Sequence, residues 1–210
     1  MKGIKFNDDM VRAILEGRKT QTRRPLKPQP EINGDRINFS FRKGASHLNL
    51  PFPCSDYSLV IRKCPFGKVG DRLFVKEAFC LEEQVESDQE PPFNDGRPTK
   101  NVWDDRWQQP HYRSTDPAPE LNYEDSDGEP TVRWKPPQNM PKWAARIFLE
   151  ITEIRVERVG EISPRDVRKE GFRTTPEFMD AWNAIYGEKG FEWIKFPWVW
   201  VLEFKRVERI

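Results

Sequence analysis

The chain has 210 residues, a length that suits one domain with a sizeable core, or one domain with a large insertion. Only 36% of the residues are hydrophobic and the formal net charge is +1, so part of the chain packs little and any nucleic-acid contact must come from a local basic patch. The sequence has no apolar run of signal-peptide or membrane-spanning length, so we expect a cytoplasmic protein with no membrane partner.

The N-terminal residues predict a short strand followed by a helix. Residues 4–6 can form the strand, and Asn7 or Asp8 can cap a helix with an apolar face. Gly17 is placed to end that helix, because glycine readily takes the left-handed conformation that follows a helix. Residues 18–24 then continue as extended or turning chain.

This connecting segment is the most informative in the sequence. It contains four cationic residues and, between them, two threonines. The cationic residues are Arg18, Lys19, Arg23 and Arg24, and the threonines are Thr20 and Thr22. Neighbouring cations lower the pKa of a lysine, and a neutral amine within reach of a hydroxyl is a general base. The segment therefore holds an anion, activates a nucleophile, or is a solvated loop that contacts nothing.

The next predicted elements are two turns. Asn33 and Gly34 favour a hairpin between the apolar residues on either side of them. Residues 67–71 contain two glycines and an aspartate and form a tight turn before residues 72–76, which alternate apolar and charged side chains as a half-buried strand does.

The middle of the chain differs in composition. Residues 77–141 hold ten of the nineteen prolines, many acidic residues and few aliphatic ones. Such a composition does not bury enough apolar surface to offset the entropy of ordering a core, so we expect residues 82–138 to be an irregular surface insertion. Four aromatic residues either pin it to the body of the protein or touch a ligand: Trp103, Trp107, Tyr112 and Trp134.

The C-terminal third is strongly patterned. Residues 147–156 form one long strand with a bulge, or two strands that meet at a bend, because the apolar alternation changes phase. Ser163 opens a capped helix that Gly171 ends, and a second helix occupies residues 175–187. Residues 198–204 alternate as a final strand.

These elements predict an α+β protein. Short strands interleave with three short helices, which favours a small curved sheet or barrel. We expect one domain over residues 1–210, with the insertion at residues 82–138.

The cysteines give no sign of a metal or cofactor. Cys54, Cys64 and Cys80 are odd in number and lack short spacing, and only His47 and His111 could join them as ligands. Reduced thiols, with no metal and no cofactor, are the expectation.

Several of these segments together resemble an ASCH domain, and most closely the ASCH proteins of bacteriophages and prophages. The resemblance implies a PUA-like β-barrel fold and an association with RNA or modified nucleosides. The segments that carry it are the end of the first helix with the basic run (16–24), the turn 67–71, residues 140–146, the capped helix 162–171 and the final strand 198–204.

One branch of that family, the amidohydrolases that cleave N4-acetylcytidine, is similar in its motif Gly-Arg-Lys-Thr-x-Thr-x-Arg. The resemblance places its catalytic lysine on Lys19, its nucleophilic threonine on Thr22 and its glutamate on Glu170. It implies attack by Thr22 on an acyl carbonyl, with Lys19 as base and Glu170 as its orienting or proton-shuttling partner. Residues three apart on a regular strand point to opposite faces, so this mechanism requires a bend between Lys19 and Thr22.

Two other functions remain open. In the first, the chain is a binding module that contacts RNA, DNA or a substrate through Arg18, Thr20, Arg23 and Arg24 while aromatic residues stack on bases. In the second, it is a phage-encoded protein whose acidic insertion meets a host partner. The sequence does not indicate an oligomeric state.

Overall fold

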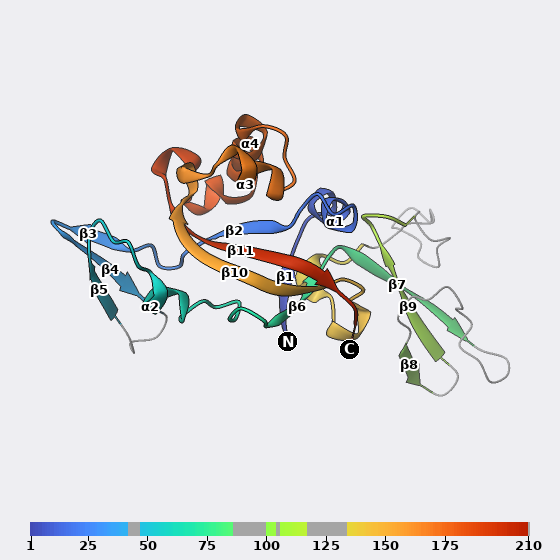
Figure 1. Cartoon of the computed structure of the whole chain (residues 1–210). Helices are drawn as coiled ribbons and strands as arrows, with labels where there is room; N and C mark the ends of the chain where they lie inside the picture. The colour runs from blue at the N-terminus through green and yellow to red at the C-terminus, as the bar shows by residue number, and fades with distance from the viewer. Residues whose placement is uncertain (42–46, 86–99, 104–105, 117–133, 210) are drawn as a thin grey trace. The chain divides into compact units, whose positions relative to one another are not determined.

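The computed structural model describes residues 1–41, 47–85, 100–103, 106–116 and 134–209 (Figure 1). This part of the chain mixes β-sheets with short helices, which confirms the α+β class. None of the described helices is both long and apolar enough to cross a bilayer.

The fold divides into two compact units. Unit 1 contains residues 1–15, 72–149 and 206–210, and unit 2 contains residues 16–71 and 150–205. The functional residues predicted from the sequence all lie in unit 2.

Unit 1 begins with the predicted strand and helix. β1 (Lys2–Lys5) pairs in parallel with β6 (Arg72–Lys76), with Ile4 opposite Val75. α1 (Asp8–Leu15) follows β1, and the Asn7 side-chain oxygen accepts a hydrogen bond from the Met10 amide at 2.9 Å. Asn7 is therefore one of the two residues that the sequence offered as the cap.

Residues 82–138 are more regular than the composition predicted. β7 (Phe79–Val85), β9 (Arg106–Tyr112) and β8 (Lys100–Trp103) form an antiparallel sheet in the order β7-β9-β8. β9 pairs with β7 on one side and β8 on the other through backbone hydrogen bonds, so a sheet forms without the aliphatic content of a core. Predictions for 86–99, 104–105 and 117–133, and for the side chains of Trp103 and Trp107, lie outside what the structure describes.

Tyr112 anchors β9 to the core of unit 1, which is one of the two roles that the sequence left open for it. Its side chain is fully buried, and its hydroxyl donates to the Ala144 carbonyl at 2.8 Å. Around it pack buried apolar residues of unit 1: Phe74, Phe79, Met140, Ala144, Ala145 and Phe148.

The main strands of unit 2 are β2 (Gln21–Pro25) and most of β10 (Phe148–Arg158) and β11 (Trp198–Val207). β2 pairs antiparallel with β11, and β10 runs as one continuous strand. The buried positions of β10 shift from Ile151 to Ile154, which is the predicted change of phase. The strand order is β1-β6-β10-β11-β2, and β10 and β11 each contribute residues to both units.

No closed barrel is found among the described strands, and the sheet ends at β1 and β2. The PUA-like barrel therefore stays a prediction.

Two helices of unit 2 pack together beside these strands (Figure 1). α3 (Pro164–Lys169) is capped by Ser163, whose hydroxyl accepts from the Asp166 amide at 3.1 Å, and α4 (Thr175–Tyr186) is capped in the same way by Thr174. Gly171 has φ 94° after α3, a conformation that glycine adopts without strain. The shared core consists of Val159, Ile162, Val167, Phe178, Trp182, Val199 and Val201.

A small sheet and a short helix complete unit 2. β3 (Glu31–Asn33) and β4 (Arg36–Ser40) form the predicted hairpin around Gly34, and β4 also pairs with β5 (His47–Pro51). α2 (Ser58–Ile61) follows.

Candidate functional site

β2 divides the basic run between two faces. Because side chains alternate along a strand, Gln21 and Arg23 share one face, while Thr22 and Arg24 point to the other. The register with β11 is continuous, with Thr22 opposite Leu202, so no bulge changes this alternation.

The structure brings Lys19 and Glu170 into direct contact. The Lys19 ammonium donates to Glu170 Oε2 at 2.7 Å and to the Glu170 carbonyl at 2.9 Å. The Lys19 side chain is 0% exposed and that of Glu170 is 2% exposed. The two residues also form an isolated β-bridge, and the Thr20 amide donates to the Lys169 carbonyl at 2.8 Å. The end of α3 is thus attached to the segment that precedes β2.

Burial changes the acid–base behaviour of Lys19. Removal of the ammonium from water lowers its pKa below the usual lysine value. Contact with Glu170 opposes this shift, and Arg24 and Arg23 add to it to a smaller extent. The sequence predicted a lowered pKa but attributed it to neighbouring cations, whereas the largest cause is burial.

Arg23 faces carboxylates inside the unit. Its guanidinium lies 3.0 Å from Glu157, 3.3 Å from Asp166 and 3.3 Å from Glu170, and its side chain is 0% exposed. We predicted that Arg23 contacts a nucleic acid or substrate. It does not face solvent, because the strand turns it toward α3.

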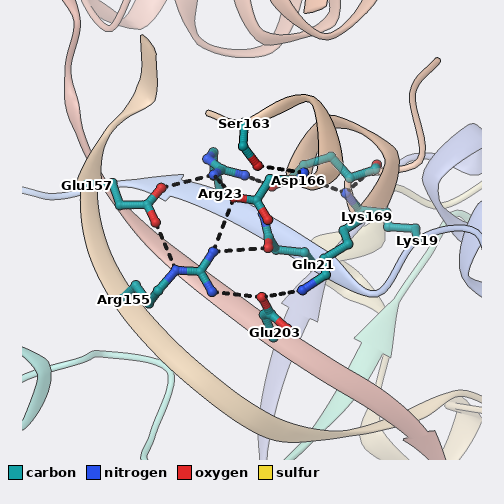
Figure 2. A network of polar contacts seen from close by, with 10 residues as sticks. Lys19, Gln21, Arg23, Arg155, Glu157, Ser163, Asp166, Lys169 and Glu203 are labelled. Atoms are coloured by element: carbon teal, nitrogen blue, oxygen red, sulfur yellow. Dashed lines mark hydrogen bonds and ion pairs between the residues drawn. The ribbon is translucent and has the colours of Figure 1, made fainter. Parts of the chain in front are cut away.

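Arg155, on β10, extends this cluster (Figure 2). Its guanidinium lies 2.8 Å from Glu157 and 2.7 Å from Glu203, and Lys169 contacts the same Glu203 oxygen at 2.8 Å. Burial lowers the pKa of Arg155, but hydrogen bonds with Glu157 and Glu203 outweigh it and raise the pKa above its usual value. Arg155 therefore keeps its positive charge within this cluster.

The acidic residues of this cluster already have arginine and lysine partners. Among the described residues, no group of three or more His, Cys, Asp and Glu side chains is arranged to hold a metal ion.

Thr22 is separated from the Lys19–Glu170 pair by the direction of its side chain. It is 1% exposed and lies on the face of β2 opposite Arg23, which itself contacts Glu170. Two of the three predicted catalytic residues are thus in contact, and the third points to the other face.

The remaining predicted binding residues lie around the strand. Arg18 is 53% exposed and its guanidinium contacts the Glu16 carboxylate, and Thr20 is exposed. Arg24 is half-buried and donates to the Tyr186 hydroxyl at 2.8 Å.

Sequence reasoning missed five members of the network: Arg155, Glu157, Asp166, Lys169 and Glu203. Asp166 lies in the first turn of α3, and its position there does not indicate that it contacts Arg23. Arg155 and Glu157 alternate with buried residues on β10, which marks them as sharing a face but does not identify what they contact.

No protein-family model, no curated protein and no solved structure matches this chain. The geometry of the residues themselves therefore carries the functional interpretation.

Because the pKa of Lys19 is lower in the folded chain than in the unfolded chain, the free energy of unfolding changes with pH in the neutral to alkaline range. Between this lowered value and the value of about 10.4 in an unfolded chain, the unfolded state binds more protons, so stability rises with pH by about 1.4 kcal/mol per unit of pKa difference. We expect wild type to gain stability relative to Lys19→Met across this window. Urea denaturation from pH 7 to 10 measures the free energy of unfolding of both proteins. A difference between them that stays constant over this range would contradict the burial of a titrating amine at Lys19.

Proposed function

We propose that the chain is an ASCH-type amide hydrolase that acts on an acylated nucleoside such as N4-acetylcytidine. The contact between Lys19 and Glu170 is the observation that carries this proposal. A resemblance in short motifs assigned these two residues to one site although they lie 151 positions apart, and they meet at 2.7 Å. The PUA-like barrel of that family is part of the same proposal, supported by the mixed sheet and short helices.

Lys19 is the proposed general base. A lysine serves as a base only when its pKa is low enough for a neutral amine to be present, and burial lowers the pKa of Lys19. Glu170 accepts a hydrogen bond from the amine and fixes its direction. The second oxygen of Glu170 contacts Arg23, which holds the carboxylate in place.

Thr22 is the nucleophile that the resemblance assigns. Its hydroxyl oxygen would attack the acyl carbonyl while its proton passes to Lys19. The C–N bond would then break, and the exocyclic amine of cytidine would leave with the proton that Lys19 returns. Water would finally hydrolyse the ester on Thr22, which releases the carboxylic acid and restores the hydroxyl. This route requires Lys19 to reach across to the face of β2 that carries Thr22. Direct activation of water by Lys19 gives the same products without Thr22.

Turnover of N4-acetylcytidine to cytidine by the purified chain tests the proposal. We expect Lys19→Met to reduce turnover by about 10²–10⁴-fold, the usual contribution of a general base. The wild-type rate should rise with pH as Lys19 loses its proton. Absorbance or chromatography distinguishes the two nucleosides, and wild type without turnover would overturn the proposal.

Lys169→Met is the matched control. Lys169 is adjacent to Glu170 in sequence but contacts Glu203, so its removal should leave turnover close to wild type. Thr22→Val keeps the shape of the buried side chain and removes its hydroxyl. Loss of turnover in Thr22→Val assigns the attack to Thr22, and retained turnover assigns it to water.

Nucleic-acid binding by the basic run is the weaker candidate. The side chains of Lys19 and Arg23 are buried, so they do not reach a phosphate group at the surface. The Arg18 guanidinium is exposed but forms an ion pair with the Glu16 carboxylate. Binding to a host partner through the acidic insertion concerns mainly residues 86–99 and 117–133, which lie outside the described part of the chain.

A further inference from the structure

Unit 1 contains a hollow of about 490 Å³ whose lining includes three arginines. Arg146 comes from the segment before β10, Arg206 lies near the end of β11, and Arg209 follows that strand. The other described lining residues are Leu15, Ile147, Val207 and Glu208, and all seven belong to unit 1. The hydrolase proposal uses none of them.

Arg206 and Arg209 are exposed and keep most of their hydrogen-bond donors for a ligand. Arg206 Nη1 donates to the Leu15 carbonyl at 3.4 Å, and Arg209 Nη2 donates to the Trp143 carbonyl at 3.2 Å. Neither guanidinium forms an ion pair or a further hydrogen bond with the residues that the structure describes. Because a guanidinium carries five N–H groups, each arginine is anchored by one contact and has other donors left for a ligand.

Arg146 is already paired. Its Nε and Nη2 donate to the Glu77 carboxylate at 3.0 Å and 2.9 Å, and its side chain is 22% exposed. Glu77 balances the charge of Arg146, so the positive charge that remains for a ligand is that of Arg206 and Arg209. Glu208, which is exposed, is the one carboxylate among the described lining residues. Two unpaired cations against one carboxylate leave the hollow positive.

The rest of the lining is aliphatic. Ile147 is 2% exposed, and Leu15 and Val207 are half-buried, so the last two offer some apolar surface. None of the described lining residues is aromatic, so a planar ring finds no stacking partner in the hollow. Charge, with a small apolar contact, is therefore what selects a ligand here.

Two open guanidinium groups favour a phosphate group over a carboxylate. A carboxylate has two oxygens and one charge, which a single guanidinium fork satisfies. A phosphate monoester has three terminal oxygens and a charge of about −1.5 to −2 at pH 7, so it engages two forks at once. We propose that the hollow binds the phosphate monoester of a small organic molecule, with the phosphate on Arg206 and Arg209 and the carbon part against Leu15 and Val207. Its volume falls within the range of ligand sites.

Calorimetric titration of the full chain with butyl phosphate, pentanoate and inorganic phosphate tests this site. We expect butyl phosphate to bind about tenfold more tightly than either of the others, because pentanoate offers only a carboxylate and inorganic phosphate lacks the apolar part. Its affinity should fall as salt rises.

Three results would overturn the proposal. Pentanoate that binds as tightly as butyl phosphate would remove the selection for phosphate, and inorganic phosphate that does so would remove the contact with the carbon part. A short oligonucleotide without terminal phosphates that binds more tightly than butyl phosphate would assign the hollow to a nucleic-acid backbone.

Paired double variants locate the binding. Arg206→Met with Arg209→Met should weaken butyl phosphate about tenfold or more, because both phosphate contacts are lost. Arg165→Met with Arg168→Met is the matched control, since it removes two exposed arginines of α3 in unit 2 and therefore the same charge. The control should bind as wild type does. An equal loss in both double variants would assign the effect to overall charge and contradict the site.

Glu208→Gln tests the site in the opposite direction. It removes the one described carboxylate of the lining at an exposed position, so it should strengthen butyl phosphate about threefold without changing the fold. Circular dichroism checks that each variant is folded. Binding that is unchanged or weaker in Glu208→Gln would place the phosphate outside this hollow.

Discussion

Glu170→Leu is expected to lower the free energy of unfolding by about 3–5 kcal/mol, the usual cost of removing one partner from a buried ion pair. The substitution leaves the Lys19 ammonium buried without its carboxylate and removes one of the three carboxylates around Arg23. The hydrogen bond of 2.7 Å between the amine and Glu170 is lost as well. Urea denaturation at pH 7, followed by circular dichroism, measures the change.

The double variant Lys19→Met with Glu170→Leu separates the pair from its surroundings. Replacing both charges with apolar side chains removes the buried ammonium, so most of the lost stability should return. Glu188→Leu is a control at an exposed position and should change stability by about 0.5 kcal/mol or less. A double variant as unstable as Glu170→Leu alone would show that the shape of the site, and not the charge pair, holds α3 to β2.

This stability effect bears on the functional assay. A variant that is partly unfolded loses turnover for a reason unrelated to catalysis. The turnover rate of Lys19→Met should therefore be measured at a temperature where its folded fraction, determined by circular dichroism, equals that of wild type. The pH profile is a second criterion once the folded fractions are matched at each pH, because the stability of wild type itself rises with pH through Lys19.

Elements with local signals were predictable from the sequence. Asn7 caps α1, Ser163 caps α3, and Gly17 and Gly171 adopt positive φ where the helices end. Each of these signals depends on a side chain or a φ angle within a few residues of the helix end, so it can be read from a short stretch of sequence.

The candidate site was predictable only in part. Lys19 and Glu170 were assigned together by resemblance, and their contact spans 151 residues. The partners of Arg23 lie 134 to 147 residues away, and no local pattern specifies which carboxylates a strand arginine meets. The direction of Thr22 depends on the phase of β2, which is fixed by its pairing with β11 and not by the residues of the basic run.

The sheet β7-β9-β8 shows where composition misleads. Proline and acidic residues predicted irregular chain over 82–138, yet strand pairing depends on backbone groups, and β7 and β9 pair in continuous register from Phe79 opposite Tyr112 to Val85 opposite Arg106. The aromatic residues gave the better indication, because Tyr112 of β9, together with Phe79 of β7, packs in the core of unit 1.

A second buried ion pair holds unit 1 together, and sequence reasoning did not find it. Glu77 is fully buried, and the Arg146 guanidinium donates to both of its carboxylate oxygens, at 3.0 Å and 2.9 Å. The Ser114 hydroxyl donates to the same carboxylate at 2.6 Å, and Arg146 lies 3.9 Å from the centre of the Tyr112 ring. Arg146 thus joins the segment before β10 to both β9 and the end of β6.

Arg146→Ala is therefore expected to destabilise unit 1 by about 3–5 kcal/mol, because it leaves the buried Glu77 carboxylate with the Ser114 hydroxyl in place of a paired charge. Arg146→Lys keeps the charge but cannot donate to both oxygens through a planar fork, so its loss should be intermediate. Arg165→Ala, at an exposed position of α3 in unit 2, is the matched control and should change stability little. Thermal and urea denaturation followed by circular dichroism measure all three, and an Arg146→Ala protein as stable as the control would show that Glu77 is not held by this pair.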